Sequence, residues 1–294
     1  MLEKFQGIFT ALVTPMHEDG SIDEASLRQL IGYNLRKGVS GFYVDGSTAE
    51  AFLLTQEERK KIIEIACDAC RGKCTVMVHV GSISTQAAID LAKHAEKSGA
   101  DAISSVPPFY YGFSFDEIAK YYEDITKSVS LPMIVYNIPA FSGVSLSMKQ
   151  FERLLSINNI IGVKFTSKDL FLMERIKRTF PNKLVFNGYD EIALSGLVAG
   201  ADGAIGSTYN VMAEKFVKIF DLVKSNRIAE AKLLQQEAND IIDTLIETGV
   251  FQGEKELLHQ LGVIKSATCR APFLSITKEN AKKLEPVAAR LEAM

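Results

Sequence analysis

The sequence of 294 residues predicts no disulfide bonds and no membrane spans, and it has no strong charge imbalance. Its four cysteines are too few for a disulfide framework in a chain of this length. No apolar run reaches the ~18 residues of a membrane-spanning helix. The 33 basic and 36 acidic residues give a net charge of −3, which argues against a dominant role in binding nucleic acid or a membrane surface. Residues 1–5 lack the charged-then-apolar order of a signal peptide, so we expect a cytoplasmic protein.

Three of the four cysteines lie close together and could suggest a metal site. Cys67, Cys70 and Cys74 have C-x2-C-x3-C spacing. The first two lie at core spacing on a helix that we expect over residues 57–69, and the third begins a strand. No fourth ligand is near them in the sequence, so we interpret them as small buried hydrophobic residues.

Apolar runs of strand length alternate with helical segments through most of the chain. Their starts advance by roughly 28 residues on average, which is the strand–helix alternation of a parallel sheet. The eight runs are residues 8–15, 41–46, 75–81, 102–107, 132–139, 160–166, 184–189 and 203–207. Eight such repeats predict an α/β protein built on an eight-fold β/α (TIM) barrel. An open doubly wound sheet fits less well, because no G-x-G-x-x-G fingerprint follows the first run.

After the eighth run the pattern contains helices only. We expect them over residues 213–225, 228–249, 254–265 and 277–292. The first closes the barrel, and no Gly/Ser/Pro linker separates the other three from it. We therefore predict a barrel domain over residues 1–225, with residues 226–294 packed on it as a C-terminal helical extension.

The sixth apolar run ends in a charge. Lys164 directly follows the apolar residues 160–163, in a segment that we expect to be a buried strand. A buried ammonium group is costly unless it is paired or loses its proton, and burial lowers the pKa of a lysine. A neutral amine at the end of a strand is a nucleophile for a carbonyl. Because barrel active sites lie at these strand ends, we take Lys164 as a candidate for an imine-forming lysine.

Hydroxyl groups occur directly after the second run and within the fifth. Gly46, Ser47 and Thr48 would place hydroxyls and backbone N–H groups at a helix N-terminus, where a carboxylate or phosphate could bind. A simple turn with a helix cap would have the same sequence. Tyr136 lies one strand away from Lys164, and its phenol could act as a general acid or base rather than only pack in the core.

Acidic and hydroxyl side chains follow the seventh and eighth runs. Asp190 and Glu191 begin a helix, where acidic residues are also favoured by the helix dipole. At a barrel mouth they could instead bind the hydroxyls of a polyol, as could Ser207 and Thr208. The glycine-rich residues 200–206 resemble a phosphate-binding segment, but the acidic pair would repel a phosphate, so we expect a neutral, hydroxyl-rich group there.

A zinc-dependent aldolase is the chemical alternative to an imine-forming lysine. It would need histidines clustered at the mouth. The four histidines are at positions 17, 79, 94 and 259, and none pair at ligand spacing. We therefore expect no metal.

Four segments in order carry a resemblance that spans essentially the whole chain. They are residues 46–50 (GSTAE), 136–139 (YNIP), 162–169 (GVKFTSKD) and 187–191 (NGYDE). Together they resemble the N-acetylneuraminate lyase branch of the dihydrodipicolinate synthase family. The resemblance implies a β/α barrel with C-terminal helices, usually assembled as a homotetramer.

The family's chemistry maps onto the candidate residues. By the resemblance, Lys164 forms a Schiff base with the keto carbon of pyruvate or of a sialic acid. Tyr136 moves the proton when the carbon–carbon bond breaks, and Ser47 and Thr48 hold the pyruvate carboxylate. Tyr110 resembles a tyrosine that reaches the site of a neighbouring subunit.

The resemblance also implies the substrate. Six positions match those that line the sugar end of the site: Thr166, Gly188, Asp190, Glu191, Gly206 and Ser207. The implied reaction is reversible cleavage of N-acetylneuraminate to pyruvate and N-acetylmannosamine. The partners are then small molecules, with no nucleic acid or membrane, and no cofactor is needed.

Two positions bear on the branch of the family. The dihydrodipicolinate synthases carry an arginine two residues after the proline of the YNIP-like segment, whereas this chain has Phe141. Ala49 stands where the family motif usually has glycine. If that position needs a left-handed backbone, alanine would add strain of about 1 kcal/mol or more.

Two alternative functions stay open from the sequence. One is another pyruvate-dependent aldolase or dehydratase acting on a different 2-keto-3-deoxy sugar acid. The other is a non-catalytic barrel that binds sugar acids, which the presence of both Lys164 and Tyr136 disfavours.

Overall fold

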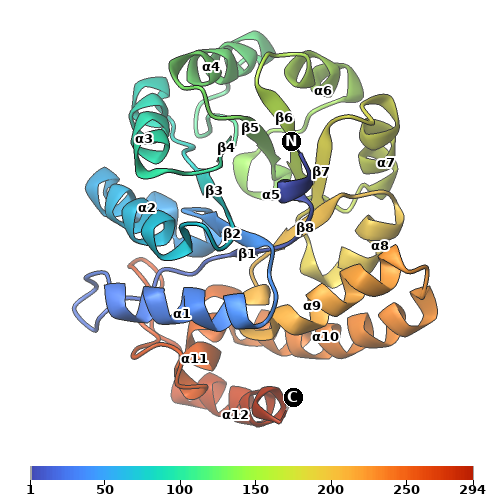
Figure 1. Ribbon diagram of the computed structural model, residues 1–294. Helices are drawn as coiled ribbons and strands as arrows, with labels where there is room; N and C mark the ends of the chain where they lie inside the picture. Colours follow the sequence, from blue (N-terminus) through green and yellow to red (C-terminus); the bar gives the residue numbers. More distant parts are fainter. Residues whose placement is uncertain (1, 294) are drawn as a thin grey trace.

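The chain folds around a closed barrel of eight parallel strands (Figure 1), and the computed structural model describes residues 2–293. Each strand pairs with the next in sequence, and β1 also pairs with β8, so the sheet closes on itself. The strands are β1 (Gly7–Ala11), β2 (Gly41–Val44), β3 (Thr75–His79), β4 (Ala102–Ser105), β5 (Met133–Asn137), β6 (Ile160–Phe165), β7 (Leu184–Asn187) and β8 (Gly203–Gly206). Every predicted apolar run coincides with one strand, which confirms the predicted barrel. The strands end one to four residues before the runs do, because there the chain leaves the sheet to form the loops of the barrel mouth.

Helices surround the barrel, as Figure 1 shows. They are α1 (Glu24–Arg36), α2 (Gln56–Cys70), α3 (Thr85–Ser98), α4 (Phe115–Ser128), α5 (Pro139–Ser142), α6 (Met148–Leu155), α7 (Leu170–Thr179), α8 (Ala193–Val198) and α9 (Tyr209–Lys224). Local sequence sets where several begin. Thr55 with Glu58 and Ser114 with Glu117 form capping boxes that satisfy the first backbone N–H groups of α2 and α4.

Three more helices follow the barrel: α10 (Ile228–Thr248), α11 (Val250–Gln260) and α12 (Lys278–Glu292). The predicted helix 254–265 is wrong at both ends. It begins at residue 250, directly after Gly249 (φ 92°) breaks the chain direction, and it ends before Gly262, whose φ of 67° is left-handed. The helix expected from residue 213 begins at residue 209, and a break at Met212 explains why its apolar periodicity starts late. The domain division at residues 225 and 226 stays a prediction.

Two layers of apolar side chains stabilise this arrangement. Inside the barrel, the rings of Phe9 and Phe186 meet edge to face with their centroids 5.8 Å apart, beside the buried Met77 and Ile205. A larger layer fills the space between the strands and the surrounding helices. Because side chains pack the barrel interior, the space for a ligand is at the mouth.

The cysteines lie on the outer layer. Cys67 and Cys70 are buried on α2, and burial raises the pKa of the Cys67 thiol to about 12, which confirms their interpretation as small buried residues. Cys74 is half-buried. Within residues 2–293, no three His, Cys, Asp or Glu side chains gather closely enough to hold a metal ion. None of the helices in this part of the chain combines the length and hydropathy that a bilayer-spanning helix requires.

Candidate active site

Lys164 lies at the carboxyl end of β6 with its side chain pointing into the barrel mouth. The residue is 4 % exposed. Its Nζ atom lies over two aromatic rings, 4.2 Å from the centroid of Tyr43 and 4.1 Å from that of Tyr136. Burial lowers the pKa of Lys164 to about 7, and the weaker attraction of Asp190 acts in the opposite direction. A substantial fraction of this amine is therefore neutral and nucleophilic at neutral pH.

Tyr136 is the neighbour of Lys164 across the β5–β6 pair, where the two residues are in register. Burial raises the pKa of its phenol to about 12, although the hydroxyls of Ser47 and Thr166 face the phenol and act to lower it. The phenol therefore holds its proton at neutral pH. It lies close enough to the lysine to exchange a proton with a group bound there.

Ser47 and Thr48 lie on a three-residue 3-10 helix, Ser47–Ala49, that follows β2. Gly46 is the N-cap of this helix, so the expected helix N-terminus is present, although the helix is only three residues long and α2 does not begin until Gln56. The condition for strain at Ala49, a left-handed backbone at this position, is not met. Ala49 has ordinary helical geometry, and the left-handed residue is its neighbour Glu50, at φ 60°. An alanine therefore fits this turn without the penalty that a positive φ would bring.

Asp190 lies at the end of the strand next to β6, on the short 3-10 helix after β7. Its Oδ2 atom accepts hydrogen bonds from the backbone N–H and the hydroxyl of Thr208, both at 2.8 Å. Burial raises the pKa of Asp190 to about 6 despite these bonds. Gly206 makes this position possible, because a Cβ atom there would lie 2.0 Å from Oδ1 of Asp190.

Gly188 has a similar spatial role on the adjoining strand end. A Cβ atom at this position would lie 1.9 Å from the hydroxyl oxygen of Thr166. Glycine therefore lets the Thr166 side chain lie directly against the backbone after β7 and face the cavity.

A cavity of about 450 Å³ joins these side chains. This volume suits a small molecule of sugar-acid size. The predicted site residues that line it are Ser47, Thr48, Tyr136, Lys164, Thr166, Gly188, Asp190, Glu191 and Ser207. The Ser47 and Thr166 hydroxyls lie beside the phenol, and Asp190, Glu191 and Ser207 follow the ends of β7 and β8.

The family model described as the dihydrodipicolinate synthetase family matches residues 4–291. The chain belongs to this family. It is 48 % identical over 289 residues to N-acetylneuraminate lyase 2 of Escherichia coli O6:H1, covering 98 % of this chain and 95 % of that protein. It is 44 % identical over 292 residues to N-acetylneuraminate lyase of Salmonella typhimurium, covering 99 % and 98 %.

Solved structures in the same family agree with this result. CdNal of Clostridium difficile, in complex with mannosamine, has a TM-score of 0.94 and 42 % identity, covering 97 % of this chain and 99 % of that one. N-acetylneuraminate lyase of Fusobacterium nucleatum, complexed with pyruvate, has a TM-score of 0.92 and 41 % identity, covering 99 % and 97 %. Dihydrodipicolinate synthase of Aquifex aeolicus has the same fold, with a TM-score of 0.92, at 27 % identity over 98 % of both chains.

Two of the predicted site residues, Gly206 and Tyr110, do not line the cavity. Gly206 instead leaves room for Asp190. Tyr110 lies apart from the cavity in this single chain. It lies in the loop between β4 and α4, is 83 % exposed, and has a left-handed backbone at φ 79°. Its ring packs edge to face on Tyr111, with centroids 5.0 Å apart. The expectation that it reaches a neighbouring subunit stays a prediction.

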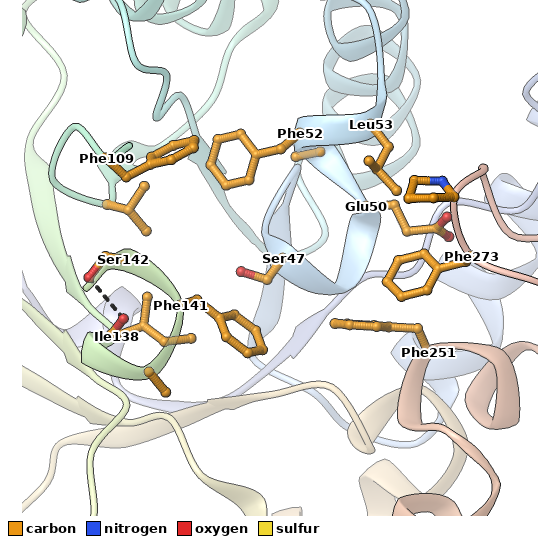
Figure 2. A pocket seen from close by; sticks show the side chains of 14 residues that line it. Ser47, Glu50, Phe52, Leu53, Phe109, Ile138, Phe141, Ser142, Phe251 and Phe273 are labelled. Atoms are coloured by element: carbon orange, nitrogen blue, oxygen red, sulfur yellow. Dashed lines mark hydrogen bonds between the residues drawn. The ribbon is translucent and has the colours of Figure 1, made fainter. Parts of the chain in front are cut away.

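A second, apolar cavity of about 580 Å³ adjoins the first and shares Ser47, Phe141, Phe251 and Phe273 with it. Figure 2 shows the Ser47 side chain in the middle of this space, with aromatic rings on both sides. Phe141, at the position where the synthase branch of the family carries arginine, contributes an apolar ring here. Phe251 and Phe273 could not be recognised as site residues from sequence, because apolar residues after the barrel resemble ordinary core positions.

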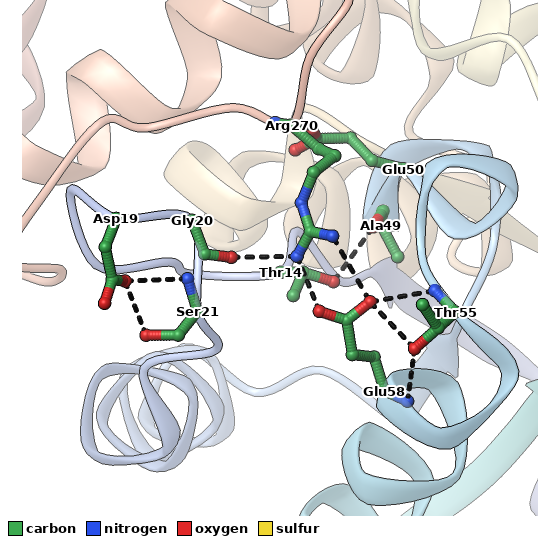
Figure 3. A network of polar contacts seen from close by, with 9 residues as sticks. All are labelled: Thr14, Asp19, Gly20, Ser21, Ala49, Glu50, Thr55, Glu58 and Arg270. Atoms are coloured by element: carbon green, nitrogen blue, oxygen red, sulfur yellow. Dashed lines mark hydrogen bonds and ion pairs between the residues drawn. The ribbon is translucent and has the colours of Figure 1, made fainter.

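The loop after β2 is held from behind by the C-terminal extension. Lys255 of α11 is 1 % exposed, and its Nζ atom lies 2.5 Å from Oε1 of Glu50. The second oxygen of Glu50 accepts the backbone N–H of Arg270 at 2.6 Å. The Arg270 guanidinium continues to Glu58, at 2.7 Å, and to the carbonyl of Gly20, at 2.8 Å, as Figure 3 shows. These contacts fix the left-handed Glu50 and thereby the turn that carries Ser47.

Proposed function

We propose that the chain is a class I aldolase that reversibly cleaves N-acetylneuraminate to pyruvate and N-acetylmannosamine through a Schiff base on Lys164. The main observation in support is the Lys164 amine, whose pKa burial lowers to about 7. This amine lies beside Tyr136 in a cavity of sugar-acid size. The extensive identity to proteins named N-acetylneuraminate lyase supports this substrate.

The proposed reaction begins with attack of the Lys164 amine on the keto carbon C2, with loss of water to form an imine. The protonated imine then accepts the electron pair of the C3–C4 bond as that bond breaks, which leaves an enamine of pyruvate. The C4 hydroxyl passes its proton to the Tyr136 oxygen while the phenol passes its own proton to the substrate carboxylate by way of the Ser47 hydroxyl, so that C4 becomes the aldehyde carbon of N-acetylmannosamine. Protonation of the enamine at C3 and hydrolysis of the imine release pyruvate and restore the amine.

The substrate orientation follows from the charges of the cavity. Ser47 and Thr48 are proposed to bind the carboxylate, next to Lys164. Asp190 and Glu191 are proposed to accept hydrogen bonds from the polyol tail, because carboxylates are acceptors for hydroxyl groups and would repel a phosphate. Phe141 offers no charge for a second substrate carboxylate, which separates this site from that of a synthase.

Borohydride trapping tests the proposal directly. Incubation with pyruvate and reduction should add the pyruvate fragment to a single peptide, the one that contains Lys164, as measured by mass spectrometry. N-acetylneuraminate should then release pyruvate in a coupled assay faster than other 2-keto-3-deoxy sugar acids do. Trapping without cleavage of N-acetylneuraminate would favour a different sugar acid, and no trapping at all would favour a non-catalytic barrel.

Replacing Tyr136 by phenylalanine should lower kcat by about 10²–10⁴-fold, because the phenol is the proposed proton relay. Pyruvate should still be trapped on Lys164, since imine formation uses the amine. Tyr33→Phe, at a half-buried position of α1 that does not line the cavity, is the matched control and should leave kcat unchanged. Full turnover in Tyr136→Phe would remove Tyr136 from the mechanism.

We also propose that the enzyme is a cytoplasmic homotetramer. The exposed pair of Tyr110 and Tyr111 supports an assembled form, because two neighbouring exposed aromatic rings are unusual on a free surface. Light scattering of the purified protein measures its mass in solution and so tests whether it is a tetramer.

A further inference from the structure

Glu254 is a buried acid that the proposed reaction does not yet use. It lies in the first turns of α11 and is 0 % exposed. Among residues 2–293, neither of its carboxyl oxygens has a hydrogen-bond partner. An unpaired carboxyl group in such a place is costly, so its presence calls for an explanation in terms of a group that it serves.

The carboxyl group of Glu254 faces the sugar end of the cavity from behind. Its polar neighbours are the Ser207 hydroxyl and the Asp190 carboxylate. Ser207 and Asp190 both line the cavity, whereas Glu254 lies one layer further out. Glu254 can therefore influence a bound sugar only through these two side chains.

Two further polar atoms without a partner in the described chain lie in the same cluster. They are Oδ1 of Asp190 and the hydroxyl of Tyr209. Gly206 brings them together, since a Cβ atom there would lie 2.0 Å from Oδ1 of Asp190 and 2.5 Å from the Tyr209 ring. Oδ2 of Asp190 is already occupied by Thr208. The free hydrogen-bonding capacity of the cluster is therefore concentrated next to Ser207.

The charge environment sets the protonation state of Glu254. Burial, together with a smaller effect of the negative charge of Asp190, raises its pKa to about 8, and only the Ser207 hydroxyl acts to lower it. The other titratable group that it influences, Cys269, has a thiol whose pKa burial raises to about 11. At neutral pH most of Glu254 is therefore the uncharged acid, which has one O–H donor.

We propose that Glu254 is a positioning residue that directs the Ser207 hydroxyl toward the polyol part of the substrate. The uncharged acid donates its hydrogen to Oγ of Ser207, so that the serine's own O–H turns into the cavity and donates to a substrate hydroxyl. Once Glu254 loses its proton it becomes an acceptor only, attracts the O–H of Ser207 and turns it away from the substrate. This inference rests on the proposed function, because it concerns the sugar end of the same site.

The test separates the two substrates of the condensation reaction. Glu254→Ala should raise KM for N-acetylmannosamine by about 5- to 10-fold, the worth of one hydrogen bond, with KM for pyruvate unchanged. In the unsubstituted chain, KM for N-acetylmannosamine should rise as pH passes through about 8. Glu254→Gln keeps an N–H donor at every pH, so it should retain a low KM and lose this rise.

Controls make each outcome decisive. Glu256→Gln, on the same helix and bonded to Gln260, should keep both KM values and the pH dependence. Borohydride trapping of pyruvate by Glu254→Ala at the normal rate shows that the barrel and Lys164 are intact. Equal effects of Glu254→Ala on both KM values, or an unchanged pH dependence in Glu254→Gln, would overturn the inference. Absence of any condensation by the unsubstituted chain would instead overturn the proposed function.

Discussion

Replacing Lys164 by methionine should abolish pyruvate trapping and lower kcat by at least about 10⁴-fold, because no other side chain of the site can form the imine. Methionine has nearly the length of lysine and no charge, so it can occupy the same space between Tyr43 and Tyr136. The loss of activity should therefore come from the missing amine rather than from a collapsed cavity.

The same substitution should make the protein more stable. The pKa of Lys164 is about 7 when folded, against 10.5 for the free side chain. Protonation of the buried amine therefore opposes folding, fully below pH 7 and progressively less between pH 7 and pH 10.5. At pH 7 we expect the free energy of unfolding of Lys164→Met to rise by on the order of 3 kcal/mol. Denaturant unfolding at several pH values measures both the gain and its decline.

Lys168→Met is the matched control, since Lys168 follows the same strand and is exposed. It should change neither turnover nor stability. In the unsubstituted enzyme, the rate of borohydride trapping should rise as pH increases through about 7, where the neutral amine becomes the major form. Residual trapping on another lysine of Lys164→Met would show that the nucleophile is misassigned.

Replacing Lys255 by methionine should lower the free energy of unfolding by about 3–5 kcal/mol, because it leaves the Glu50 carboxylate buried without its cation. Both partners of this ion pair are nearly fully buried, and Nζ of Lys255 also donates to the carbonyl of Thr268 at 2.8 Å. Chemical unfolding measures the loss. Activity should fall as well, since Glu50 directly follows the turn that carries Ser47 and Thr48.

A second substitution, at the ion-pair partner Glu50, makes this test more specific. Adding Glu50→Gln to Lys255→Met should recover part of the lost stability, because the unpaired buried charge is removed, and a double-mutant cycle then gives the coupling between the two side chains. Lys120→Met breaks an exposed pair with Asp124 and should leave the unfolding midpoint unchanged. A Lys255→Met protein as stable as this control would show that the extension does not hold the loop.

The barrel and most of the cavity could be predicted because their signals are local. Each strand is an apolar run that ends in polar residues, and the closed parallel topology then brings those ends together. Lys164 and Tyr136 were identifiable because a polar group in an apolar run is anomalous within a few residues of sequence. The backbone of the turn around Ala49 could not be predicted in this way. Its left-handed residue is Glu50, and the ion pair of Glu50 with the distant Lys255 stabilises that conformation.

Residues of the extension could not be recognised from sequence. Glu254 and Lys255 are adjacent charged residues on a helix, which normally face solvent. Both are buried here because α11 docks against the barrel and carries them to two different loops of the mouth, toward Ser207 after β8 and Glu50 after β2. Their role depends on how α11 packs against the barrel, and the periodicity of the sequence does not predict that packing.

The closure of β1 against β8 has a consequence for synthesis on the ribosome. Gly7 pairs with Gly203, and Glu50 pairs with Lys255, which is 205 residues further along the chain (255 − 50). At about 5–20 residues per second, the loop that carries Ser47 waits roughly 10–40 s for its buried cation. Throughout most of that time β1 is an open sheet edge, the kind of edge that pairs with other chains. The nascent protein therefore becomes both safe from such pairing and competent for catalysis only near the end of translation.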